Sequence, residues 1–130
     1  MALTGPIPEL VEQNLKHVVI CAGTHLMATA LVIKVNIPFA HKVIKLRSHL
    51  NVVLSTADTI ATLKNTSGTA FTGGVLTITS TGSVADRDTS TDITAGTQEQ
   101  AKDTDVQISI NGASGAGEAT FWLELERDDS

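Results

Sequence analysis

The sequence predicts an all-β domain, an antiparallel β-sandwich or jelly roll that carries a short N-terminal arm. From Thr24 onward the apolar residues recur with a period of two, which is the period of a strand that buries one face. The segments with this period are short, and clusters of Gly, Asn, Pro and Ser separate them. Strands do not alternate with long helical patterns, which disfavours an α/β fold.

Composition limits the class of protein further. A chain of 130 residues with 42% apolar and 18% charged residues fits one folded domain. We assign residues 1–16 to the arm and residues 17–130 to a single β-sandwich domain. The net charge of −5 argues against nucleic-acid binding, and we expect neither a secretory leader nor a membrane span. Cys21 has no partner for an intrachain disulfide, and we expect a buried thiol.

The arm contains the helix-compatible stretch "PELVEQNL", in which Pro8 suits the first turn. It offers Leu10, Val11 and Leu15 as apolar contacts, but so short a helix is marginal by itself. We therefore expect the arm to dock on another surface.

The first strands are expected at His17–Cys21 and Thr24–Val35, with "CAG" between them. The second strand is apolar on both faces, which is typical of a covered central strand or of a subunit contact. Its two faces carry Leu26, Ala28, Ala30 and Val32 on one side, and Met27, Leu31, Ile33 and Val35 on the other.

The segment "HKVIKLRSHLN" predicts a third strand. Alternation places Ile44, Leu46 and Leu50 on one face, and Val43, Lys45, Arg47 and His49 on the other. We call Lys45, Arg47 and His49 the basic strip. His41 would share this face with His49, but eight residues span about 27 Å in a strand, too far for one metal ion.

Strands are also predicted at Thr59–Lys64, "GVLTITS", "DVQISI" and "EATFWLELE". Their inward residues are expected to be Leu76 and Ile78, then Val106, Ile108 and Ile110, and finally Ala119, Phe121, Leu123 and Leu125. Between the second and third of these strands, residues 83–104 form a long polar segment, and loops of this length are usually functional or mobile.

The glycine-rich stretch "NGASGAG" predicts a hairpin turn into the final strand. Gly112, Gly115 and Gly117 do not have the spacing of a dinucleotide-binding loop, and a strand pattern follows in place of a helix. Asp86 to Asp92, in "DRDTSTD", lacks the Gly and Glu of an EF-hand loop and is interpreted as a solvated acidic segment. We expect no catalytic site, no metal site and no cofactor.

Trp122 alternates with core residues and is expected on the outer face of the last strand. A large apolar side chain in that position indicates an interface, or a surface that the chain's own arm or loop covers.

The order "ALVIKVNIPFAHKVIKLRSHL", "TADTIATLKNTSGTAFTGGVLTITS" and "AKDTDVQISINGASGAGEATFWLELE" resembles capsid decoration (cement) proteins of tailed bacteriophages, of the jelly-roll type. The likeness covers residues 24–126 and lies in the order of the elements. It implies a homotrimer on the capsid exterior, assembled in the host cytoplasm, which binds the major capsid protein at threefold or quasi-threefold positions.

Exposed apolar groups and charge suggest the contact residues. We expect capsid contacts at Leu10, Val11, Leu15, Lys45, Arg47 and His49, and subunit contacts at Leu26, Ala28, Val32 and Trp122. A phage tail or fibre component that contacts the host surface through residues 83–104 is the alternative. A carbohydrate-binding module is a third reading, which the shortage of aromatic rings disfavours, and an enzyme is a fourth, disfavoured because no polar constellation converges.

Overall fold

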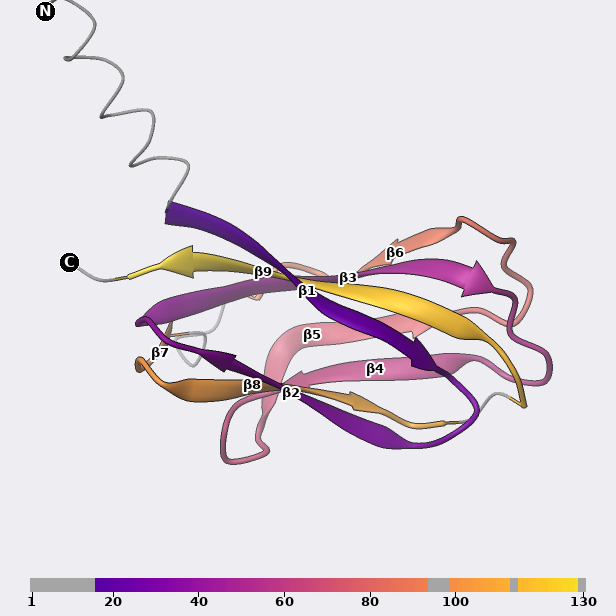
Figure 1. Ribbon diagram of the computed structural model, residues 1–130, viewed down its shortest axis with the longest axis horizontal. Helices are drawn as coiled ribbons and strands as arrows, with labels where there is room; N and C mark the ends of the chain where they lie inside the picture. The colour runs from indigo at the N-terminus through magenta and orange to yellow at the C-terminus, as the bar shows by residue number, and fades with distance from the viewer. Residues whose placement is uncertain (1–15, 94–98, 113–114, 129–130) are drawn as a thin grey trace, which may run out of the picture.

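The computed structural model describes residues 16–93, 99–112 and 115–128, and within them it shows two antiparallel sheets packed face to face (Figure 1). The predicted all-β sandwich is confirmed. Sheet A has the order β1 (His17–Leu26), β9 (Glu118–Arg127), β3 (His41–Val52) and β6 (Arg87–Thr89), and β7 (Glu99–Gln100) also pairs with β3. Sheet B has the order β2 (Leu31–Ile37), β8 (Thr104–Ile110), β4 (Thr59–Lys64) and β5 (Ala70–Ile78).

The strand pairing is that of a jelly roll. When the two-residue β7 is left aside, the first strand pairs with the last, the second with the second to last, and so on inward to the β4–β5 hairpin. The first four strands thus pair with the last four in reverse order, as in a long hairpin that is rolled into two sheets.

The core lies between the sheets and is built by the residues that alternation predicted for the last strands. The predicted inward residues of β5, β8 and β9 are all 1% exposed or less. Phe121, Met27, Ile37, Leu46 and Leu63 are among the largest fully buried side chains.

The predicted strand 24–35 is wrong, because the chain changes sheets in its middle. β1 runs through "CAG" with a bulge between Cys21 and Gly23 and ends at Leu26. β2 then begins at Leu31 in the other sheet. Met27, in the turn between them, is fully buried, and its N–H donates to the carbonyl of Gly117 at 3.0 Å. The apolar pattern on both faces therefore records a crossing between sheets.

In β3 the predicted face of Val43 is wrong, because the register of β3 against β9 shifts between Val43 and Lys45. Val43 is fully buried, and Ile44 is half-buried at the shift. A bulge of this kind adds one residue and reverses the alternation that follows it. His41 consequently faces the interior, on the opposite side from His49, where the two were predicted to share a face.

Two further expectations are corrected. The "NGASGAG" turn does not close a hairpin, since β8 pairs with β2 and β4 whereas β9 pairs with β1 and β3. It carries the chain from sheet B to sheet A. Cys21 is exposed because it lies on the outer face of an edge strand.

The polar segment 83–104 contains β6 and β7, and its residues 94–98 lie outside the described part of the chain. Between these strands, Ser90 and Ile93 donate their backbone N–H groups to Leu46 and Ile44, both at 2.9 Å. Ile93 is only 3% exposed. The segment therefore closes one side of the sandwich.

Candidate binding surfaces

The outer face of sheet A carries a hollow that Trp122 lines. In the register of the sheet, Trp122 lies between Arg47 on β3 and Cys21 on β1. The hollow has a volume of about 440 Å³, and its lining includes Val19, Arg47, His49, Arg87, Asp88, Thr89, Trp122 and Glu124. The hollow thus combines one large aromatic ring with several ionisable groups.

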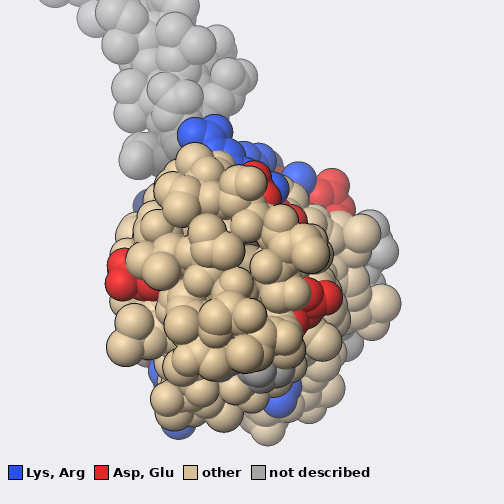
Figure 2. Space-filling model, turned by 90° about the vertical axis from the view of Figure 1, so that its right-hand side faces the viewer, with Lys and Arg blue, Asp and Glu red and all other residues tan. Residues whose placement is uncertain are grey.

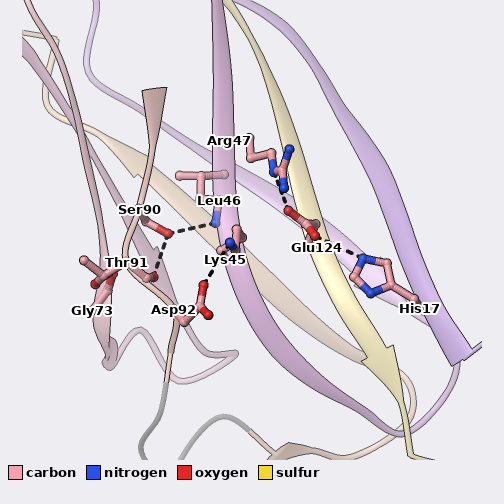
Figure 3. A network of polar contacts seen from close by, with 9 residues as sticks. All are labelled: His17, Lys45, Leu46, Arg47, Gly73, Ser90, Thr91, Asp92 and Glu124. Atoms are coloured by element: carbon pink, nitrogen blue, oxygen red, sulfur yellow. Dashed lines mark hydrogen bonds and ion pairs between the residues drawn. The ribbon is translucent and has the colours of Figure 1, made fainter. Parts of the chain in front are cut away.

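Glu124 is a nearly buried carboxylate beneath this surface that binds two basic side chains. Its side chain is only 7% exposed, and it accepts hydrogen bonds from Arg47 Nε and, at 3.0 Å, from His17 Nε2 (Figure 3). These partners come from β3 and β1, on either side of β9. Nearby, Lys45 Nζ lies 2.9 Å from an oxygen of Asp92. Two of the three residues of the basic strip are therefore already paired with carboxylates.

His49 is held by a chain of polar side chains across three strands. The Nδ2 group of Asn51 donates to Thr120 Oγ1 at 2.7 Å, so the Asn51 oxygen is turned toward His49 Nδ1, 2.9 Å away. Thr120 Oγ1 in turn lies 2.7 Å from Thr24 Oγ1. Because the amide oxygen can only accept, His49 donates through Nδ1–H, which leaves Nε2 for another partner. The ring packs edge-on against Trp122, with centroids 6.4 Å apart.

The three aspartates of "DRDTSTD" do not converge. Asp86 accepts the Ser83 N–H at 2.8 Å, and Asp92 pairs with Lys45, whereas Asp88 lines the hollow. Burial raises the pKa of Asp88, and the negative charge of Asp86 raises it further. Within the described ranges, no group of three His, Cys, Asp or Glu side chains is placed to hold a metal ion.

A second surface, the apolar end, lies where β1 and β3 finish. Leu26 and Val52 both pair with Glu118, one on each side of it, and are 64% and 49% exposed. Val53 is 40% exposed, and Val84 is 60% exposed. Val84 is held near this end because the N–H of the next residue, Ala85, donates to the Leu50 carbonyl. Figure 2 faces this end and shows mostly uncharged residues, with the charged ones toward the margin.

The structure brings together only some of the predicted contact residues. The basic strip and Trp122 share the outer face of sheet A, although they were assigned to different partners. Leu26 lies at the apolar end, and Ala28 is exposed in the β1–β2 turn that follows it. Val32 is 50% exposed on the outer face of sheet B, across the sandwich from Trp122. The remaining predicted contacts, Leu10, Val11 and Leu15, lie outside the described residues.

Sequence reasoning missed the role of Glu124, which alternation grouped with the outward polar residues. Its carboxylate is bonded by His17 and Arg47 from the two neighbouring strands, and both residues lie far away in the sequence. No local signal marks it.

Comparison of the chain with models of protein families, and with curated proteins, found no match. None of the helices in the described part of the chain is long and apolar enough to cross a bilayer.

Proposed function

We propose that this protein is a structural component of a tailed-phage virion. It decorates the exterior of the head as a homotrimer and binds between subunits of the major capsid protein at threefold or quasi-threefold positions. The order of its sequence elements supports this role, and so does the jelly roll, a fold found in viral capsid proteins as well as in lectins. A fold by itself does not decide function, so the argument rests on the surface.

The observation that carries the proposal is the position of Trp122. It is a half-buried aromatic at the centre of an open sheet face, beside Arg47, and Trp and Arg are the residues most often found as anchors of protein interfaces. The charges of Arg47 and Lys45 are already matched by Glu124 and Asp92. Such a face loses less hydration energy on docking than one with unpaired charges.

We assign the two surfaces to two partners. The outer face of sheet A, with Trp122 and the basic strip, contacts the capsid. The apolar end, with Leu26 and the neighbouring Ala28, contacts the next copy of the chain. Three modest capsid contacts on one trimer reinforce each other through effective concentration, and binding that favours the mature shell stabilises it by mass action.

Copy number in purified virions tests the proposal. Quantitative mass spectrometry should find this chain at a level comparable with the major capsid protein, and electron microscopy should place it on the head. A level close to that of tail proteins, with density on the tail, would contradict a head role. Light scattering should give about three times 13.6 kDa for the isolated protein.

Trp122→Ala tests the surface. Loss of a central aromatic anchor should weaken binding to undecorated heads by more than tenfold, about 1.4 kcal/mol or more. Val75→Ala is the matched control, because Val75 is 50% exposed on the outer face of the opposite sheet. Equal binding by the two variants would remove Trp122 from the interface.

A second candidate is favoured by the chemistry of the hollow. A saccharide ring could lie against Trp122 while its hydroxyls reach His49 Nε2, Arg87 and Asp88. This would suit a tail or fibre component that contacts the host surface. Titration of Trp122 fluorescence with oligosaccharides from the host envelope tests it, and a saturable change together with a tail location would favour this candidate over head decoration.

A further inference from the structure

The two sides of the sandwich are closed to different extents. On the β5–β6 side, the segment after β6 crosses between the sheets: Thr91 donates through Oγ1 to the Gly73 carbonyl at 2.9 Å, and Ile93 is buried. On the other side lie β1 and β2, the outermost strands of their sheets, at the front of Figure 1. Their inward side chains pack on the core but remain partly exposed: Val18, Ile20, Ala22, Leu31, Ile33 and Val35. We call these six residues the open edge.

β1 is also unprotected as an edge strand. Its ten residues, "HVVICAGTHL", include no Lys, Arg, Asp, Glu or Pro. Edge strands of native proteins are normally guarded by such residues, by bulges or by a covering element. β1 has only the bulge between Cys21 and Gly23. A covering element is therefore expected over the open edge.

We propose that residues 7–15 of a second copy of this chain cover the open edge. In that segment Ile7, Leu10, Val11 and Leu15 have the spacing i, i+3, i+4, i+8, which forms one apolar stripe on a helix. From first to last the stripe is about 12 Å long at 1.5 Å per residue. The open edge matches this length, since Val18 to Ala22, like Leu31 to Val35, spans about 13 Å along a strand.

The connection to β1 indicates that the helix belongs to a second copy. The proposed stripe ends at Leu15 and β1 begins at His17, so only Lys16 lies between them. Connections between a helix and a strand that pack together usually have about 2 to 6 residues, which let the chain reverse. One residue is too short a connection for the segment to turn back over the inward face of its own β1.

Two copies can exchange arms reciprocally, or the arm of each copy can meet the edge of the next in a head-to-tail contact, which forms a ring when the rotation closes. A ring of three rests on the proposed function, but the exchange itself does not. It also assigns Leu10, Val11 and Leu15 to the neighbouring copy, whereas the sequence suggested a capsid contact.

Disulfide trapping tests the proposal in the full chain. Two single-cysteine variants, Val11→Cys and Ile33→Cys, are made in a Cys21→Ser background, given tags of different size and co-expressed. Oxidation should give a mixed disulfide dimer. Val11→Cys with Val75→Cys is the control and should give none, because Val75 lies on an outer sheet face. A Val11→Cys/Ile33→Cys double variant that closes within one chain, or no crosslink at all, would overturn the proposal.

Light scattering provides the second readout. Leu10→Asp/Val11→Asp should reduce the mass to the 13.6 kDa of a single chain, while Glu12→Gln, on the polar side, should keep the oligomer. Far-UV circular dichroism checks that both variants remain folded. An oligomer that survives the double aspartate variant would exclude the arm as the occupant. These results do not depend on virion location, so they can fail while the head proposal stands, and the reverse also holds.

Discussion

Replacing Gly112 by Ala should destabilise the protein far more than replacing Gly68 by Ala. Both glycines have positive φ, +67° and +86°. The difference lies in their surroundings. A Cβ at Gly112 would lie 2.2 Å from the Ala30 nitrogen and 2.6 Å from the Thr29 carbonyl carbon, whereas a Cβ at Gly68 would meet nothing within 4 Å.

The magnitudes follow from these two terms. An L-residue in the left-handed region costs about 1–2 kcal/mol, and this is all that Gly68→Ala should lose. Gly112→Ala carries the same cost and must also displace the backbone of the β1–β2 turn, which holds the fully buried Met27. A loss of at least about 3 kcal/mol is expected, as for damage to a core. At about 4 °C per kcal/mol for a domain of this size, the two melting temperatures should differ by at least about 4–8 °C.

Chemical denaturation of the two variants and the wild type measures both losses. Gly68→Ala serves as the control for backbone strain, so the difference isolates the contact between the two turns. If the losses agreed to within about 0.5 kcal/mol, which is the scale of ordinary surface substitutions, the turns would not be packed as described. The crossing between sheets at Met27 would then need another explanation.

Three further changes test the titrating groups. Burial lowers the pKa of His41 below its usual 6.5, and its hydrogen bond to the Phe39 carbonyl opposes this to a smaller extent. The contribution of His41 to stability should therefore be complete above pH 6.5 and decline as the pH falls toward the lowered pKa of the folded state. His41→Gln should flatten this pH dependence in denaturation curves. The pKa of Asp88 is raised above 3.8, which means that the ionised carboxylate destabilises the folded state. Asp88→Asn should therefore raise the melting temperature at neutral pH and leave it unchanged below pH 3.8. Glu124→Gln should lower the free energy of unfolding by no more than about 1 kcal/mol, because its partners Arg47 and His17 are half exposed. The same change should weaken head binding, because it releases Arg47. A loss of stability as large as that of a core substitution would contradict the first expectation.

The fold was predictable where it depends on neighbours in the sequence. Alternation identified the buried faces of β5, β8 and β9, and the bounds of β4, because each strand shows its own pattern. The sheet crossing at Met27 was missed, because an apolar run that changes layers has the same composition as one fully buried strand. The partners of β8 and β9 were missed because pairing across the roll joins residues far apart in the chain.

The candidate surface was predictable in its parts and not in its assembly. Trp122 was expected on an outer face, and so was the basic strip, from alternation alone. That both lie on one face follows from the pairing of β3 with β9, which no local pattern reports. The same pairing places Arg47 against Glu124 and thereby neutralises a strip that the sequence alone presents as basic.

The bulge in β3 shows how closely the core and this surface depend on each other. Before it, His41 and Val43 face the interior, and after it Leu46 and Leu50 do. His41 and Val43 are an odd number of residues away from Leu46 and Leu50, so in a strand with unbroken alternation the two pairs would lie on opposite faces. Such a strand could bury only one pair. If it buried Val43, it would also turn the basic strip inward and carry Arg47 away from Trp122. The extra residue at Ile44 lets both pairs reach the core while the basic strip stays outside, so one local irregularity decides which residues β3 contributes to the outer face of sheet A.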